Sequence, residues 1–373
     1  MANTAVNSDL VEKKFLSDFF KEYIRGSRFS RYTGTGVNNV IVIKEGRKKI
    51  EIPLVTRLKG NGVSGSNTLR GNGENIGNYG MELAPTYKRH AVEFDKEELE
   101  KPAIDLMKAA KPLLMDWAME LTRDEVITAF AAMHTGSAYV GIASASEANA
   151  DAWLANNADR VLFGAAKSNN AANDHSAALA QLDSVNDTLS AGIVSLAKRM
   201  AKTADPHIRP IKTSEDEEWY VMFADPYAFR DLKEDSVMAQ ANREARNRGK
   251  DNPLFRDGDL IYDGVIIREV PEIADFVDGI DGTATTLNLV TGSADTGRVG
   301  MCFLCGTQAV GFGLGQRPKT VLDSTYDYGF QPGVACELKH DIKKMFFSNE
   351  ANGGGGYVQH GLVTVYVSAA VDA

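Results

Sequence analysis

The feature that most constrains this fold is a glycine-rich segment between residues 60 and 80, which holds seven glycines and five asparagines. Such a composition favours turns and supplies little apolar surface, so the segment cannot form a core of its own. Strand patterns lie on both sides of this segment. Residues 40–54 before it read as strand, turn and strand, and residues 92–94 after it read as a further strand. Residues 38–94 are therefore predicted to form one long excursion, which could reach up to ~80 Å at ~3.3 Å per residue. We expect an arm of that length to lie on a neighbouring molecule.

The composition is that of a folded globular protein. The chain has 373 residues, 43% of them hydrophobic, and a mean hydropathy of -0.24, which is enough for one large core or two to three smaller domains. No stretch approaches the ~20 apolar residues that cross a bilayer, and residues 1–9 lack the layout of a secretory signal. Three cysteines are too few for a disulfide framework and indicate a reducing compartment. No membrane partner is expected, and synthesis is expected in a cytoplasm.

Two helices are predicted in the first third of the chain. Residues 9–24 form an amphipathic pattern in which the aromatic residues gather largely on one side. A long helix is predicted from Asp95, the N-cap, to about residue 135, with Glu98 completing a capping box. Pro112 lies inside this second helix and is expected to kink or split it.

The remaining elements alternate between helices and strands. Residues 137–173 read as loops with short elements around Trp153 and Phe163, and 176–202 as one helix. Strands are predicted at 219–223, 299–304 and 363–367. Asp225 followed by a proline predicts a helix over 227–246, and Asp263-Gly264 predicts a tight hairpin over 260–267. The fold class is α+β.

No pattern typical of an enzyme survives inspection. Ser66 stands where a nucleophile elbow needs glycine, and Asp251 stands where a phosphate-binding loop needs Ser or Thr. The six histidines are far apart in sequence. Cys302-x-x-Cys305 lies in an apolar run, where cysteine usually acts as a small buried hydrophobe, although redox or metal chemistry stays open. No catalytic residue, metal or cofactor is therefore assigned.

The net charge of the chain argues against a protein that binds nucleic acid tightly. The net charge is -9, whereas tight binding to phosphates uses clustered Lys and Arg. Two basic groups lack interleaved aromatics for base stacking and are interpreted as solvated or intersubunit groups: Lys44, Arg47, Lys48 and Lys49, and Arg243, Arg246, Arg248 and Lys250.

The order of elements resembles that of a known fold. The strings that carry the resemblance are EKKFLSDFFKEY, LVTRLKGNGVSG, KPAIDLMKAAKPLLMDWAMEL, WYVMFADPYAFRDLK, LIYDGVIIREV, MCFLCGTQAVGFGLGQRP and DYGFQPGVACELKHDIKKMFF. Taken in this order they resemble the major capsid proteins of tailed bacteriophages, with the Hong Kong 97-like fold, and in particular the family typified by phage N-four. The resemblance implies an N-terminal arm (1–37), an extended loop (38–94), a spine helix (95–136), a linking segment (137–172), an axial domain (173–332) and a peripheral return (333–373).

By this resemblance the chain is a structural protein of the virion. It is expected to assemble with itself as hexamers and pentamers into an icosahedral head, aided by a separate scaffolding protein, a portal protein and a decoration protein, and to enclose double-stranded DNA without reading its sequence. Intersubunit contacts are expected at Phe15, Phe19, Tyr23, Lys48, Lys49, Gly62 and Gly71. No lysine is singled out for a covalent crosslink, and no large fused scaffold is expected. Two alternatives stay open: an encapsulin-type nanocompartment shell, and a soluble α+β enzyme or sugar-binding domain.

Overall fold

The structure, a computed structural model, describes residues 26–46, 48–55, 58, 60–74, 76–97, 106–134, 139–142, 145–183, 185–212, 217–240, 260–278, 298–348 and 356–369. It divides into two compact units. Unit 1 comprises Met1–Ser27, Tyr87–Leu121 and Gln316–Lys339, and unit 2 comprises Arg28–Thr86, Thr122–Gly315 and His340–Ala373. Helix α2 (Leu106–Ala131) and strands β14 (Val310–Asp323) and β15 (Gly333–Lys344) each contribute residues to both units.

A seven-stranded mixed sheet forms the centre of unit 2. Its order is β11 (Leu260–Tyr262), β12 (Val265–Glu269), β10 (Glu218–Ala224), β13 (Arg298–Cys305), β18 (Leu362–Ala369) and β8 (Val161–Phe163), with β9 (Ile211–Lys212) paired to β10. The β10–β12 and β18–β8 pairs are parallel, and the β10–β13 and β13–β18 pairs are antiparallel. Every residue of β18 is buried, as expected for a strand that is covered on both faces.

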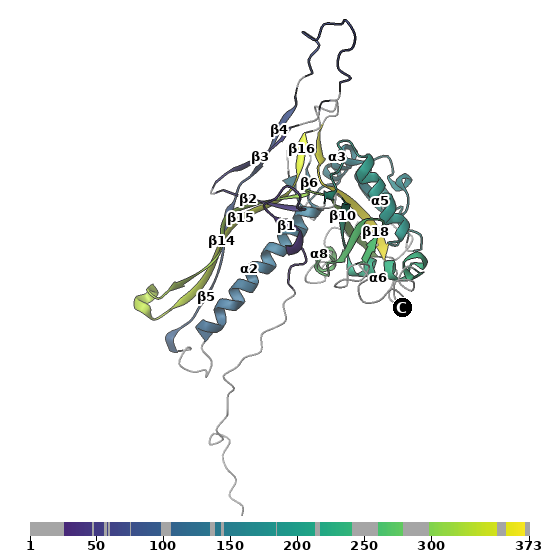
Figure 1. Ribbon diagram of the computed structural model, residues 1–373. Coiled ribbons are helices and arrows are strands. Elements are labelled where there is room, and N and C mark those ends of the chain that lie inside the picture. The colour runs from purple at the N-terminus through teal and green to yellow at the C-terminus, as the bar shows by residue number, and fades with distance from the viewer. Residues whose placement is uncertain are drawn as a thin grey trace, which may run out of the picture. The chain divides into compact units, whose positions relative to one another are not determined.

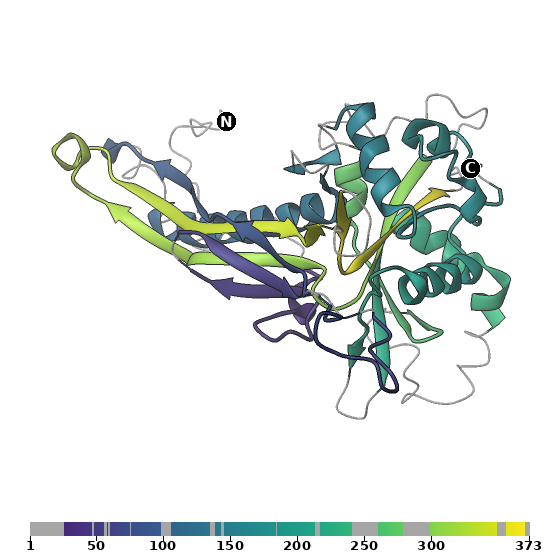
Figure 2. The same cartoon turned by 90° about the horizontal axis from the view of Figure 1, so that it is seen from above.

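Helices cover both faces of this sheet. One face packs against α5 (Ala191–Thr203) and α6 (Pro226–Glu234), and α5 lies beside the sheet in Figure 2. The other face packs against α3 (Glu147–Asn157), α4 (His175–Leu179), α8 (Glu272–Asp278) and the second half of α2. In this second core the ring centroid of Phe29 lies 4.8 Å from that of Phe223 and 5.6 Å from that of Phe130. These aromatic contacts fix the chain where it enters unit 2.

Smaller strand pairs complete unit 2. Strand β2 (Ile41–Glu45) pairs in parallel with β14 at Val310–Leu314 and with β1 (Thr33–Gly34), which follows the short helix η2 (Ser30–Tyr32). The other pairs are antiparallel: β6 (Met133–His134) with β7 (Tyr139–Val140), β16 (Phe346–Ser348) with β17 (Tyr357–Gln359), and β3 (Ile50–Val55) with β4 (Asn78–Leu83). A further short helix, η4, spans Lys167–Asn169.

Unit 1 has a small core of its own. There β15 lies between β14 and β5 (Thr86–Glu93), and the first half of α2 packs on these strands. The buried residues of this core are Ala110, Leu114, Ala118, Val334, Cys336 and Leu338. The short helix η7 (Tyr326–Gly329) forms the turn at the end of the β14–β15 hairpin, coloured yellow-green in Figure 2.

Local sequence signals are confirmed at several elements. Strands at 219–223, 299–304 and 363–367 are present as β10, β13 and β18. Asp225 caps α6 by accepting a hydrogen bond from the Tyr227 backbone amide at 2.8 Å. In the β11–β12 hairpin, Asp263 and Gly264 adopt φ angles of 47° and 67°, the left-handed conformation expected for this turn.

Three predictions about element boundaries are wrong. The strands at 40–54 do not form a hairpin with each other, because β2 pairs with β14 and β3 pairs with β4. The single helix over 176–202 is instead α4 and α5, separated by a turn in which the Asp183 carboxylate accepts backbone amides of residues 185 and 186. The predicted helix over 227–246 is interrupted: α6 ends at Glu234, Asp235 leaves helical geometry (ψ 131°), and helix resumes over 236–240.

The long helix differs in one respect from the prediction. Helix α2 passes through Pro112 without splitting. Residues 98–105 and 135–138 lie outside the described residues, and with them Glu98 of the capping box, which stays a prediction. The helix predicted at 9–24 and the basic group at 243–250 also lie outside them. The proposed six-part division of the chain stays a prediction.

Candidate functional site

An arm formed by β3, β4 and the loop between them is an exposed part of unit 2. In Figure 1 the two strands run away from the seven-stranded sheet, and the loop continues beyond them. One face of the strand pair is apolar: Ile50, Ile52, Leu54 and Tyr79 pack with Met81, Leu83, Met345 and Phe347. Alternation in β3 therefore anchors the base of the arm and leaves its other face in solvent.

The loop of the arm is held by bonds among its own residues. The Gly60 amide donates to the Glu74 carboxylate at 2.6 Å, and the Asn72 side chain donates to the Thr68 carbonyl at 2.7 Å. Gly62 and Gly71, both predicted contact residues, are exposed and adopt φ angles of 68° and 91°. Glycine is needed at these two turns because other residues are strained in the left-handed conformation.

Four large apolar side chains on the arm are uncovered. Val55, Leu58, Leu69 and Ile76 are between 59% and 68% exposed. Burying such a side chain contributes ~1.5–3 kcal/mol, so a group of four in one projecting segment is typical of a binding surface. The contact residues predicted from the sequence on this arm, two lysines and two glycines, do not include these four, although large apolar residues in an otherwise polar segment are a recognisable signal.

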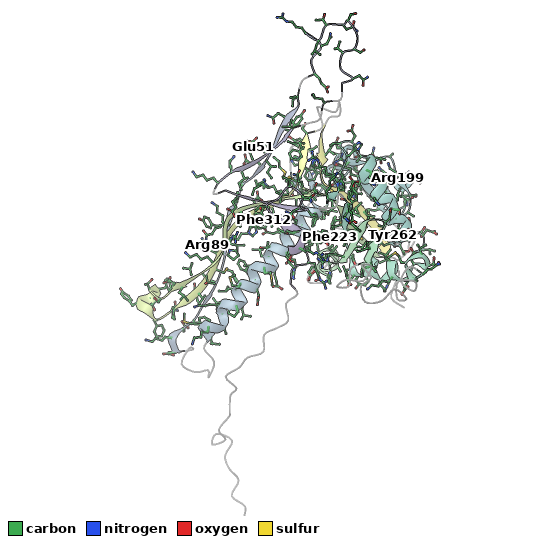
Figure 3. The ribbon with its side chains drawn as sticks, in the orientation of Figure 1. Glu51, Arg89, Arg199, Phe223, Tyr262 and Phe312 are labelled. Carbon is green, nitrogen blue, oxygen red and sulfur yellow. The ribbon has the colours of Figure 1, made fainter. Side chains whose placement is uncertain are left out.

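The two predicted contact lysines lie near the base of the arm and are both exposed. Lys49 forms an ion pair with Glu82 at 2.9 Å across the β3–β4 pair, whereas Glu51 lies directly opposite Glu82 in the register and is visible on the arm in Figure 3. Lys49 therefore offsets the repulsion between two carboxylates. The other predicted contact residues, Phe15, Phe19 and Tyr23, lie outside the described residues.

The cysteine pair has a structural role. Cys302 and Cys305 are fully buried in β13, and they belong to the cores on opposite faces of the sheet. Side chains three positions apart in a strand point to opposite faces, so these thiols cannot ligate one ion together. Burial raises the pKa of Cys305 well above its usual value, which keeps the thiol protonated. The interpretation as buried hydrophobes is confirmed.

One acidic cluster has a local explanation. Glu147, Asp151 and Asp174 bring carboxylate oxygens within 4.8 Å of one another. Each accepts a backbone amide at the start of α4: Ser176 at 2.9 Å, His175 at 2.7 Å and Ala177 at 2.8 Å, respectively. These carboxylates satisfy the donors that a helix N-terminus leaves unpaired.

The most unusual buried polar group is Lys344. Its ammonium group donates to the Gln359 side-chain oxygen at 3.1 Å and lies over the rings of Phe346 and Trp153, at 5.3 and 5.6 Å. Burial lowers the pKa of Lys344 to about 7. The Gln359 amide group in turn donates to the carbonyls of Arg160 and Leu362, and Arg160 donates to the carbonyls of Gln359 and Pro206. This network joins Arg160, the residue before β8, to β15 and β17 inside unit 2.

In the described part of the chain, no helix is both long and apolar enough to cross a membrane.

The combination of a two-faced central sheet, a long helix packed on a strand hairpin, and a projecting glycine-rich arm defines a shell-forming structural protein with the Hong Kong 97-like capsid fold. The family model described as phage capsid protein matches residues 3–371, and the chain belongs to this family. Members are structural proteins, so the expectation that the chain is not an enzyme agrees with the family, as does a location in the virion.

Individual relatives agree with this assignment. The chain is similar to a solved structure of the cyanophage Pam1 capsid asymmetric unit, with 33% identity, complete coverage of both chains and a TM-score of 0.86. The capsid protein of Ralstonia phage GP4 shares the fold, with 21% identity, complete coverage of both chains and a TM-score of 0.70. The major capsid protein of Pseudomonas phage KPP25 is 30% identical over 188 residues, which are 49% of this chain and 46% of that protein. That match therefore spans less than half the length of the relative.

Proposed function

We propose that this chain is the major capsid subunit of a tailed phage and that the β3–β4 arm is one of its main assembly surfaces. The observation that carries the proposal is the group of four uncovered apolar side chains on the arm of a protein from the phage capsid family. An isolated subunit leaves Val55, Leu58, Leu69 and Ile76 in water. Contact with a neighbouring copy removes them from water and supplies the driving force for association.

The predicted contact residues have distinct roles in this proposal. Gly62 and Gly71 shape the loop so that its apolar side chains can follow a neighbour's surface. Lys48 and Lys49 are exposed cations at the base of the arm and contribute to orientation more than to affinity, because exposed ion pairs are weak.

The N-terminal segment is proposed as a second assembly element. The sequence pattern of residues 9–24 predicts a helix with Phe15, Phe19 and Tyr23 on its apolar face. A helix of this length is marginally stable in isolation, so its apolar face requires a partner surface. That surface is a neighbouring subunit or the scaffolding protein.

The remaining partners follow from the proposed role. Copies of the chain form hexamers and pentamers of an icosahedral head, with a portal protein, a scaffolding protein and a decoration protein as further partners. The subunits are made in the cytoplasm of the host bacterium. The head encloses double-stranded DNA, and an acidic subunit of net charge -9 confines the DNA without gripping it.

Electron microscopy of the purified chain tests this proposal. Expressed alone or with its scaffolding protein, the chain should form capsomers, tubes, sheets or closed shells, and particles from infected cells should contain DNA. Compact monomers under every condition would contradict the capsid role. Particles that contain an enzyme and no DNA would instead support an encapsulin-type compartment.

Phe19→Asp tests the role of the N-terminal helix. The charge should lower particle yield because it blocks burial of the apolar face, while the melting temperature of the free subunit should stay unchanged. Lys21→Asp provides the control on the polar side of the same predicted helix. Normal particle yield from Phe19→Asp would contradict the proposed contact.

A further inference from the structure

The turn at the end of the β14–β15 hairpin presents three aromatic side chains to solvent. Tyr326, Tyr328 and Phe330 alternate with smaller residues and are 63%, 106% and 42% exposed. Exposed aromatic residues gathered at one point are unusual on a protein surface that has no partner. Tyrosine is also enriched among the residues that contribute most to protein interfaces.

The backbone of this turn holds Tyr328 outward at an energetic cost. Asp327, Tyr328 and Gly329 have successive φ angles of 46°, 53° and 86°. The first two are not glycine, and the left-handed conformation is unfavourable for a tyrosine. The turn is held in place by Asp323, whose carboxylate accepts the Thr325 amide at 2.9 Å and the Thr325 hydroxyl at 2.8 Å.

A pocket lies beside this turn in the same unit. Its volume is about 170 Å³. Its lining combines the small apolar residues Ala91, Val321, Val334 and Ala335 with Tyr326 and Asp323 of the turn itself. Cavities of about 150 Å³ accept a benzene ring, so the pocket has room for one aromatic side chain. Glu93 at the pocket, an exposed carboxylate, offers an acceptor for a hydroxyl group.

We infer that the Tyr328 ring of one copy inserts into this pocket of a second copy. The inference rests on the proposed shell function, which makes further copies of the chain its most abundant neighbours. Tyr328 is fully exposed, so it does not fill the pocket of its own chain. The pocket supplies apolar walls for the ring and the Glu93 carboxylate for the phenol hydroxyl.

The arrangement of donor and acceptor also defines the symmetry of the contact. Tyr328 and the pocket are different surfaces of one copy, so the contact is heterologous: each copy inserts one ring and receives another. A heterologous contact forms a closed ring where the rotation between successive copies closes, and an open filament where it does not.

Disulfide trapping between two single variants tests the contact directly. Tyr328→Cys and Val321→Cys chains are co-assembled into particles and oxidised, and linked chains are counted by non-reducing electrophoresis. Covalent dimers should form in mixed particles and not in particles of either variant alone. The three native cysteines are buried and should give no background. Mixed particles that assemble but give no more linked chains than each single variant would overturn the inference while leaving the proposed shell function intact.

A double-mutant cycle tests the same contact by measuring the coupling free energy between Tyr328 and the pocket. Tyr328→Ser should raise the subunit concentration needed for half-maximal assembly about tenfold or more, as expected for an interface tyrosine. Ala91→Phe, which fills the pocket from within, should give a similar defect, and the double variant should be no worse than either single variant. Val185→Ser, at an equally apolar exposed site in unit 2 (79% exposed), is the matched control.

The outcomes of this cycle separate two explanations. Melting temperatures of the free variants should equal that of the parent chain, which excludes misfolding as the cause. Additive defects, or a normal assembly curve for Tyr328→Ser, would mean that Tyr328 and the pocket do not meet. Failure of the parent chain itself to assemble would count against the proposed shell function.

Discussion

Lys344 shows how a single residue can set the pH dependence of unit 2. The amine is fully buried, its pKa is lowered to about 7 by burial, and its hydrogen-bond acceptor, the Gln359 amide, is neutral. In the unfolded chain lysine titrates near 10.4. Between these values the unfolded state holds a proton that the folded state lacks, so stability rises with pH from about 7 to about 10. Below pH 7 both states are protonated and the dependence disappears.

Replacing this lysine by a shape-matched apolar residue should therefore stabilise the protein. Lys344→Met is expected to raise the melting temperature at pH 7 and to flatten the rise in stability between pH 7 and about pH 10. Thermal unfolding at several pH values measures both effects. Lys343→Met is the control, because Lys343 is partly exposed and pairs with Asp341 at 3.0 Å. A lower melting temperature for Lys344→Met across this range would show that the amine is a favourable part of the buried network.

Some residues of this fold could be predicted from the sequence because their signals are local. Asp225 caps the helix that directly follows it, and Asp263-Gly264 forms a turn with its own neighbours. The burial of Lys344 could not be predicted, because its partners come from other elements. Gln359 lies in β17, and Trp153 lies in α3, far away in the sequence. Alternation in β15 puts Lys344 on the same face as Leu338 and Ile342, but a lysine reads as a solvent-facing residue until its neighbours are known.

At the scale of elements, the arm combines a fixed base with an uncovered loop. Replacing residues 60–76 by a short Gly-Ser turn keeps β4 and its packing on Met345 and Phe347. We expect the melting temperature of the free subunit to change little, since surface loops contribute little to a core. Shell formation should fail. Light scattering and negative-stain images measure assembly, and intact assembly with a destabilised subunit would show that the loop packs within its own chain.

Strand positions were predicted better than strand partners. The patterns at 40–54 identify β2 and β3, but β2 pairs with a strand more than 260 residues later, as in the register of Ile41 with Val310. Alternation states which face of a strand is apolar and carries no information about its neighbour. The same limit explains why the pocket beside the β14–β15 turn, built from β5, β14 and β15, has no sequence signature.

At the scale of the whole molecule, the two units differ in the size of their cores. Unit 1 buries one small cluster around Leu114 and Leu338, whereas unit 2 buries two large clusters on either side of its sheet. Segments with few buried apolar contacts open more readily. Hydrogen exchange in the free subunit should therefore be faster in β5 than in β13 and β18. Equal protection in all three strands would mean that the chain opens only as a single cooperative body.

The place of β18 within the seven-stranded sheet has a consequence for the timing of synthesis. This strand, Leu362–Ala369, lies between β13 and β8 and is buried along its whole length. Until it has been translated and released from the ribosome, β8 has no partner in the sheet and β13 has an open edge. A nascent chain therefore cannot complete the seven-stranded sheet of unit 2 until β18 is available. Because β18 closes the sheet, a chain in which it has not yet docked leaves the edge of β13 open to pairing with another chain.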